Sequence, residues 1–333
     1  MDLSTTYLGL KLKNPLIVGS SGLTSQVQKI KELEESGAGA VVLKSIFEEE
    51  IALEYDQVLK EIEEEGFSRG NYDYYDYEIR ANRLGEYTAL IRECKKCLTI
   101  PVIASVNCTY SHEWVSFAKE LEAAGAGALE LNMFFLPSDF TRSREEQEKA
   151  YLGVVDKIRR AVSIPVALKI SFYFSSLGAT IKLLSQMGVA GIVLFNRFFQ
   201  LDFDIEKFKV VPSHTLSGPG DYAMPLRWIA IMAKRIGGGC DLAASGGVHD
   251  GKSAVKMILA GAKAVQVVSA IYKNGAGHIK AILDEMKGWM NRHGYGSLDQ
   301  FMGKMSQAES ENPAVYERVQ FMRYFGDGEW SMR

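Results

Sequence analysis

The sequence has little cysteine and no long apolar runs, and these absences exclude several classes of protein. Four cysteines in 333 residues are too few for a disulfide framework. No apolar segment is as long as a transmembrane helix, and the start shows no signal-peptide pattern. A net charge of −3 gives no electrostatic basis for binding nucleic acid or an anionic membrane. We therefore expect a cytoplasmic protein that binds neither of them.

The sequence also lacks the side-chain clusters that hold metals. Cys94 and Cys97 form a Cys-x-x-Cys pair, for which a redox or metal-binding role is one interpretation. No second such pair and no nearby pair of histidines completes a zinc or iron–sulfur set. We favour two ordinary thiols at the end of a helix, and we predict no metal site.

Four segments share one pattern: small residues, a short apolar run and a final polar residue. The small residues allow a tight turn from a helix into a strand, and the apolar run is typical of a strand buried on both faces. Polar residues at the carboxyl ends of parallel strands are where α/β proteins place their chemistry. The four segments are 37–45, 125–132, 188–196 and 261–269.

Four further segments complete a set of eight predicted strands, two of them opening with Ile-Pro. The eight ranges are 15–20, 39–45, 101–106, 127–132, 165–170, 190–196, 241–245 and 263–268. Helical stretches separate them, at 25–36, 85–97, 112–124, 146–162, 175–187, 223–236, 250–260 and 276–291. This alternation favours a closed (β/α)8 barrel of the α/β class over an open doubly wound sheet.

Three parts of the chain do not fit the barrel repeat. We expect one domain over 1–333, with insertions at 46–84 and 197–239 and a C-terminal extension at 294–333. The first insertion contains a tyrosine-rich segment at 72–77. We expect that segment to form a packing or subunit surface, and a lid over a planar substrate is the alternative.

Polar residues end the predicted strands, with neither carboxylates nor histidines among them. Phosphate often binds in barrels after strands seven and eight, where glycines allow close backbone approach. Here those loops carry Gly246-Gly247 and Val268-Ser269. We therefore predict a phosphate site there.

The ordered motifs resemble those of the dihydroorotate dehydrogenases, most nearly the soluble class 1 branch, over nearly the whole chain. They are Thr5 to Pro15, Lys44-Ser45, Glu130-Leu131-Asn132, Leu168-Lys169, Leu216 to Pro219 and Ala244 to Val248. The resemblance implies an FMN-containing (β/α)8 barrel that oxidises dihydroorotate to orotate in pyrimidine synthesis. It also implies a homodimer.

The resemblance further implies roles for individual residues. The FMN ligands would be Ser20, Ser21, Lys44, Ser45, Ser105, Asn132, Lys169, Gly218, Gly246, Gly247, Val268 and Ser269. Lys169 would place positive charge beside the flavin and stabilise its reduced form. The substrate ligands would be Lys44, Asn132 and Asn196.

The sequence departs from the family after Asn132. Where the family carries its catalytic Cys or Ser, this chain has Phe135, which cannot take a proton. Pro137 replaces a substrate-binding Asn, and Arg197 replaces a Ser or Thr. The cofactor half of the site is retained and the substrate half is changed, so the catalytic base is unknown.

Three hypotheses follow. The first is an FMN-dependent oxidoreductase acting on dihydroorotate or a related small planar substrate, with a base among Ser138, Tyr173 and the 72–77 tyrosines. The second is a flavin-binding protein with little or no catalysis. The third is a flavin-free lyase that uses Lys169 or Lys44 as a Schiff-base nucleophile.

Overall fold

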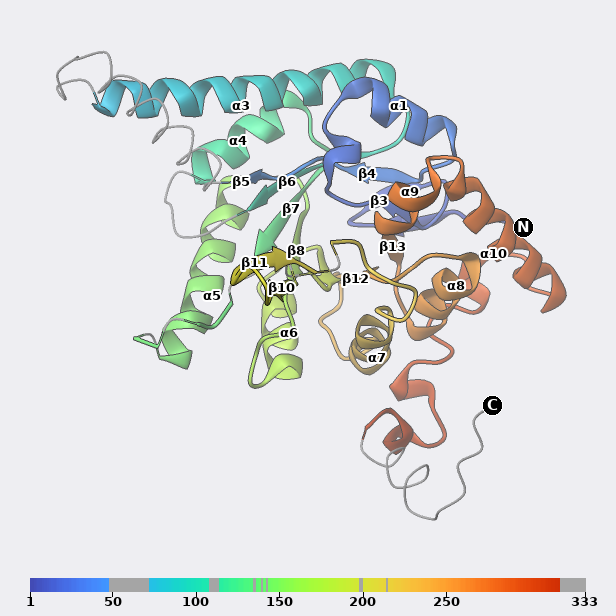
Figure 1. Ribbon diagram of the computed structural model, residues 1–333. Coiled ribbons are helices and arrows are strands. Elements are labelled where there is room, and N and C mark those ends of the chain that lie inside the picture. Colours follow the sequence, from blue (N-terminus) through green and yellow to red (C-terminus); the bar gives the residue numbers. More distant parts are fainter. Residues whose placement is uncertain are drawn as a thin grey trace.

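Parallel strands close into a barrel at the centre of the computed structural model (Figure 1). The structure describes residues 1–47, 72–107, 114–133, 136–138, 140–141, 143–197, 200–213 and 215–317. Eight strands of this part form the barrel: β3 (Leu16–Val18), β4 (Ala40–Val42), β6 (Val102–Asn107), β7 (Ala128–Met133), β8 (Val166–Ile170), β9 (Gly191–Leu194), β12 (Asp241–Ser245) and β13 (Ala264–Val267). The predicted α/β barrel is confirmed.

Parallel pairing runs around the whole ring. Pairing of β4 with β6, through Val41 and Val102, joins the two ends of the strand order and closes the sheet. A short strand β5 (Ile46–Phe47) continues the second barrel strand and pairs with the end of β6. Because all eight strands run the same way, their carboxyl ends meet at one mouth of the barrel.

Small apolar side chains fill the barrel interior, and an N-terminal hairpin packs against them. The hairpin consists of β1 (Thr5–Tyr7) and β2 (Leu10–Leu12), and its Tyr7 and Leu8 side chains are buried in the same cluster as the inward-facing barrel residues. Gly191 allows this close approach, because a Cβ at that position would lie 2.5 Å from Cδ2 of Leu8.

The barrel helices follow the predicted order. They are α1 (Val27–Glu35), α3 (Tyr72–Cys97), α4 (Trp114–Ala124), α5 (Arg144–Ala161), α6 (Leu177–Gln186), α7 (Ala223–Met232), α8 (Gly251–Ala260) and α10 (His278–Arg292). Local sequence explains several starts. For α5, Ser143 accepts a hydrogen bond from the Glu146 amide while the Glu146 carboxylate accepts one from the Ser143 amide.

Helix α3 begins earlier than predicted. The sequence predicts a start at residue 85, but the helix already begins at Tyr72 and includes the tyrosine-rich segment. The helix continues through Gly85, because a single glycine costs an interior helix position only about 1 kcal/mol. The end of the predicted insertion at 84 therefore lies inside a continuous helix.

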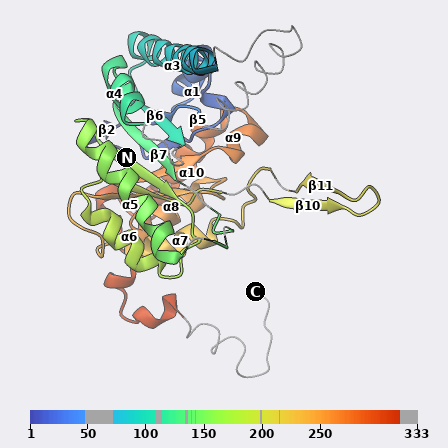
Figure 2. The ribbon, with the colours of Figure 1, turned by 90° about the vertical axis from the view of Figure 1, so that its left-hand side faces the viewer.

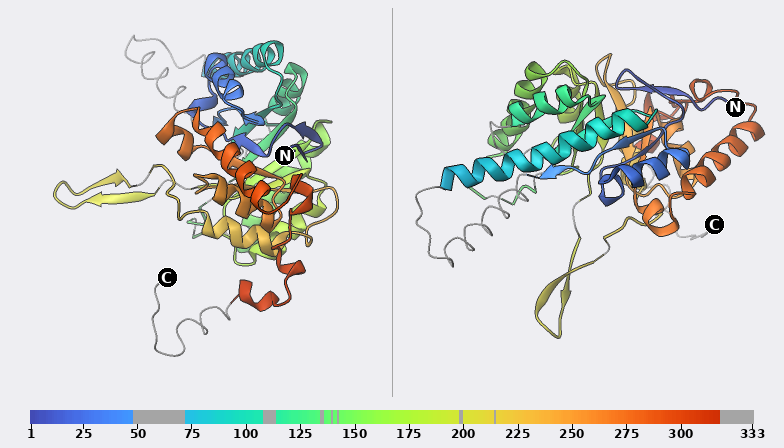
Figure 3. Two further views of the ribbon diagram at one scale, coloured as in Figure 1. Left: turned by 90° about the vertical axis from the view of Figure 1, so that its right-hand side faces the viewer. Right: turned by 90° about the horizontal axis from the view of Figure 1, so that it is seen from above.

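A hairpin projects from the barrel within the second predicted insertion. It pairs β10 (Leu201–Asp204) with β11 (Lys209–Pro212) and extends far beyond the surrounding helices (Figures 2 and 3). Its large apolar side chains are exposed, including Phe203 at 64% and Phe208 at 94%. The hairpin therefore carries an apolar surface that this chain does not cover within its described residues.

The described part of the C-terminal extension packs back onto the barrel. It contains the short helices η3 (Leu298–Gln300), η4 (Gln307–Glu309) and η5 (Pro313–Tyr316). Phe301 is fully buried, and the amides of Gly303 and Met305 donate to carbonyls at the end of α8. Residues 298–306 are therefore anchored to the end of α8 and bury Phe301 there.

The structure places the Cys-x-x-Cys pair on a helix, as the sequence predicts. Cys94 and Cys97 both lie on α3 as free thiols, and burial raises the pKa of Cys94 to about 12. A thiol with so high a pKa is a poor nucleophile and metal ligand.

Among the described helices, none combines the length and apolar character needed to cross a bilayer.

Candidate active site at the barrel mouth

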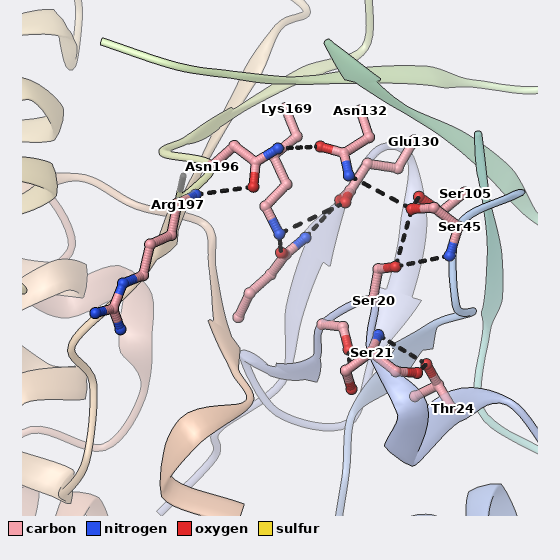
Figure 4. A network of polar contacts seen from close by, with 12 residues as sticks. Ser20, Ser21, Thr24, Ser45, Ser105, Glu130, Asn132, Lys169, Asn196 and Arg197 are labelled. Carbon is pink, nitrogen blue, oxygen red and sulfur yellow. Dashed lines mark hydrogen bonds and ion pairs between the residues drawn. The ribbon is translucent and has the colours of Figure 1, made fainter. Parts of the chain in front are cut away.

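Three serines from consecutive barrel strands lie close together near the carboxyl ends of these strands (Figure 4). Ser20 follows β3, Ser45 lies between β4 and β5, and Ser105 is inside β6. The Ser45 hydroxyl is 3.0 Å from that of Ser20 and 2.7 Å from that of Ser105, and the Ser45 amide donates to Ser20 at 2.9 Å. The structure thus brings together three of the predicted cofactor ligands.

Two asparagines extend this network across the mouth. Asn132 on β7 donates from Nδ2 to the Ser45 hydroxyl at 3.4 Å, and Asn196, after β9, donates from Nδ2 to Oδ1 of Asn132. The Arg197 amide donates to Oδ1 of Asn196 at 2.8 Å. These bonds fix the orientation of both amides.

A buried lysine lies beside the asparagines. Lys169 on β8 is 7% exposed and donates from Nζ to Oε1 of Gln266 on β13 at 2.8 Å. Its Nζ is 3.9 Å from Oε1 of Glu130 on β7. Burial lowers the pKa of Lys169 and raises that of Glu130, because removal from water disfavours both charged forms.

A second group of residues comes from the loops that the sequence predicts to bind phosphate, the predicted phosphate loop. The Ser217 amide donates to the Ser269 hydroxyl at 2.9 Å, and the Gly247 amide donates to the Ser217 hydroxyl at 3.3 Å. The Ser217 carbonyl lies 2.8 Å from Nε2 of His249 and accepts from Nζ of Lys273 at 3.1 Å. Burial lowers the pKa of His249, because removal from water disfavours its charged form.

Among the glycines of the predicted phosphate loop, Gly247 has the least room for a Cβ atom. Its φ is +72°, and a Cβ there would lie 2.1 Å from the backbone nitrogen of Tyr222. Replacing Gly247 by alanine should lower the free energy of unfolding by about 1–3 kcal/mol through backbone strain, with the clash adding to it. Chemical denaturation measures this loss.

A matched control for that substitution lies nearby. Gly220 has no positive φ, and a Cβ there meets nothing within 4 Å. Gly220→Ala should therefore unfold close to wild type. Equal losses of stability in the two variants would contradict this account of Gly247.

A cavity of about 800 Å³ touches one residue of each group, Asn196 of the first and Ser217 of the second. Its lining includes Asn196 and Phe195 from the end of β9 and Ser217, Ser245 and Gly246 from the phosphate side. A volume of this size accommodates a cofactor-sized ligand. Arg197 also lines the cavity, where it pairs with Asp221 at 3.7 Å, and its side chain points away from the serine–asparagine network (Figure 4).

Several predicted ligands lie outside these two groups or contribute only backbone atoms. The Ser21 hydroxyl caps the short helix η1 (Gly22–Thr24), and the Gly218 amide donates to the Asp221 carboxylate at 3.0 Å. Lys44 is exposed after β4. Ser269 does not end a strand as predicted; with Val268 as its N-cap, it begins the short helix α9 (Ser269–Asn274).

The candidates for a catalytic base differ in their position relative to the cavity. Tyr173 lines the cavity beside Asn196, whereas Ser138 is exposed and donates to the Leu136 carbonyl. Phe135, which the motif resemblance places at the family's base position, and the side chains of the 72–77 tyrosines lie outside the described residues. Tyr173 is therefore the candidate that the described geometry places at the site.

Five residues at or near the candidate site were not predicted from the sequence. Asn107 ends β6 next to Asn132 in the strand register, and Glu130 and Gln266 lie inside the barrel. Each is a polar residue within or ending an apolar strand run, which is the signal that could have identified it. His249 and Lys273 follow the glycine pair and Ser269, and no spacing in the sequence indicates that both reach Ser217.

Comparisons with known proteins agree with the motif resemblance. The family model for dihydroorotate dehydrogenase matches residues 2–290. The chain is 28% identical over 313 residues to the catalytic subunit of dihydroorotate dehydrogenase B (NAD(+)) of Thermoplasma volcanium, covering 91% of this chain and 98% of the relative. It is 25% identical over 312 residues to dihydroorotate dehydrogenase A (fumarate) of Lactobacillus helveticus, covering 89% and 96%. Chloroplastic dihydropyrimidine dehydrogenase (NADP(+)) of Arabidopsis thaliana is 25% identical over 338 residues, covering 92% and 77%.

Proposed function

Because the chain belongs to the dihydroorotate dehydrogenase family, we propose that it is an FMN-dependent dehydrogenase. Its substrate would be dihydroorotate or a related small planar molecule with an oxidisable CH–CH bond. The relatives named for dihydroorotate and for dihydropyrimidines support this class of substrate. The observation that carries the proposal is the convergence of Lys169, Asn132 and the phosphate loop around one mouth of the barrel.

The residues present fit an FMN molecule. The phosphate loop offers the Ser269 hydroxyl, nearby Lys273 and the glycine pair, which suits a phosphate monoester. The cavity leads from this loop to Asn196 near the buried Lys169. A phosphate at one end and a polar, partly aromatic site at the other match the two ends of FMN.

Each part of the site would have a separate task in the reaction. Bound FMN supplies the chemistry of accepting a hydride. Lys169 places a cation at the cofactor site, which favours the additional negative charge of a reduced ring. Asn132 and Asn196 hold the substrate ring by its polar edge, and Tyr173, which lines the cavity, is the first residue to test as a proton acceptor.

The colour of the purified chain tests the cofactor directly. The full chain, refolded or reconstituted with FMN and passed through a desalting column, should retain FMN in a one-to-one ratio, identified by chromatography of the released flavin. A colourless protein that retains no FMN would refute the proposal. It would also favour the flavin-free Schiff-base alternative, which borohydride trapping at Lys169 tests independently.

A homodimer is part of this proposal, and the β10–β11 hairpin is the surface that supports it. Phe203 faces Val210 across the hairpin and Leu201 faces Pro212, so these side chains share one apolar face. Exposed apolar surfaces of this kind mark protein–protein contacts. Changing Phe203 and Val210 to glutamate should convert a dimer into a monomer, as measured by light scattering.

The control for the hairpin variant is Lys209→Glu. Lys209 pairs with Asp204 on the opposite face of the hairpin, so this change adds negative charge without touching the apolar face. It should leave the dimer intact. A wild-type chain that is monomeric, or a dimer unaffected by the two glutamates, would overturn the assignment.

A further inference from the structure

Three polar side chains meet deep inside the barrel, each from a different strand. Glu130 on β7, Lys169 on β8 and Gln266 on β13 are 1%, 7% and 2% exposed. Figure 4 shows Glu130 close to Lys169, just below the asparagines of the mouth. Polar groups in such a position require partners, because the barrel interior offers little water.

Gln266 connects the two charged groups. Its Oε1 accepts from Nζ of Lys169 at 2.8 Å, while its Nε2 donates to Oε2 of Glu130. The amide can satisfy both partners only in this orientation, because a lysine donates and a carboxylate accepts. The three groups therefore form one chain with a fixed direction.

Glu130 depends on Lys169 for a compensating charge. Among the described residues, no group donates a hydrogen bond to Oε1 of Glu130, and the Lys169 ammonium at 3.9 Å is its ion-pair partner. The dependence is mutual, since burial by itself lowers the pKa of Lys169 and the Glu130 charge opposes that change. Removing either charge leaves the other uncompensated in the barrel interior.

We propose that Glu130 is a positioning residue that holds the Lys169 ammonium at the flavin site through Gln266 and thereby sets the reduction potential of the flavin. This proposal rests on the proposed FMN cofactor. Glu130 acts through Lys169, so its effect must disappear when Lys169 is absent. The proposal also predicts that a neutral residue of the same shape at position 130 changes the reduction potential of the flavin and not only the stability of the barrel.

The test is the midpoint potential of bound FMN, measured by reductive titration against a redox dye. In Glu130→Gln, Lys169 loses its counter-charge and burial favours the neutral amine. The ratio of reduced to oxidised flavin at a fixed potential should fall by at least about tenfold, which for a two-electron couple is about 30 mV. Gln266→Met, which breaks the connecting amide, should shift the potential in the same direction and serves if Glu130→Gln does not fold.

Two controls separate this role from a structural one. In the Lys169→Met background, adding Glu130→Gln should leave the potential unchanged. Asp241→Asn changes a different carboxylate, which accepts from the Leu8 amide at the opposite end of the barrel, and should also leave the potential unchanged.

Each outcome decides between the proposals. A Glu130→Gln protein that binds FMN with the wild-type potential would overturn the role of Glu130 and leave the proposed function standing. The same shift with and without Lys169 would show that Glu130 does not act through it. A wild-type chain that binds no FMN would refute the proposed function and this inference with it.

Discussion

Replacing Lys169 by methionine should slow reduction of the bound flavin by substrate about 10²–10³-fold, the usual loss when a group that stabilises developing charge is removed. Methionine keeps the length of the side chain and removes its charge. Lys169 is almost fully buried and held by Gln266, so no exposed cation can take its place without rearrangement. Anaerobic stopped-flow spectroscopy measures the rate from the bleaching of the flavin band.

The matched control for this variant is Lys182→Met. Lys182 is exposed on α6, outside the barrel, and its replacement should leave the reduction rate unchanged. The two variants remove the same charge from the chain, so a difference between them reports position and not net charge. A Lys169→Met protein reduced at the wild-type rate would contradict the assigned role of the lysine.

Replacing Phe135 by cysteine should raise the rate of dihydroorotate oxidation by about 10²–10⁴-fold, the usual contribution of a general base. The motif resemblance places Phe135 where the family carries its catalytic Cys or Ser, and Phe135 offers no group that can accept a proton. Steady-state turnover with dihydroorotate and an artificial electron acceptor measures the gain. The wild-type chain should turn over dihydroorotate correspondingly slowly.

Phe135→Leu controls for the change in side-chain size at this position. Leucine is smaller than phenylalanine but cannot act as a base, so it should produce no such gain. If the wild-type chain oxidised dihydroorotate rapidly and the cysteine added nothing, another residue would already supply the base. Tyr173, which lines the cavity, would then be the first position to substitute.

The barrel could be predicted because a local sequence pattern marks each of its strands. Each apolar run is bounded by small residues or proline, so β6, β7 and β8 lie within a residue or two of their predicted ranges. The polar residues that end these strands converge simply because the strands are parallel. Ser45, Asn132 and Lys169 follow from that rule alone.

The parts that could not be predicted depend on contacts between distant segments. Glu130 and Gln266 are far apart in sequence and meet only because the ring closes, and the partners of Lys169 were therefore missed. The projecting hairpin has no packing partner within the described chain, so no pattern of buried residues in the sequence predicts it. The early start of α3 at Tyr72 was not predicted either, although Gly85 costs the helix interior only about 1 kcal/mol.

The central claim is that this barrel mouth binds FMN and passes to it a hydride from a small planar dihydro substrate. The most direct measurement is the anaerobic absorption spectrum of the FMN-loaded full chain during titration with dihydroorotate and with dihydropyrimidines. The account predicts that at least one of these compounds bleaches the flavin band stoichiometrically, and that Lys169→Met slows the bleaching. A chain that holds FMN but whose flavin none of these compounds reduces would contradict the claim.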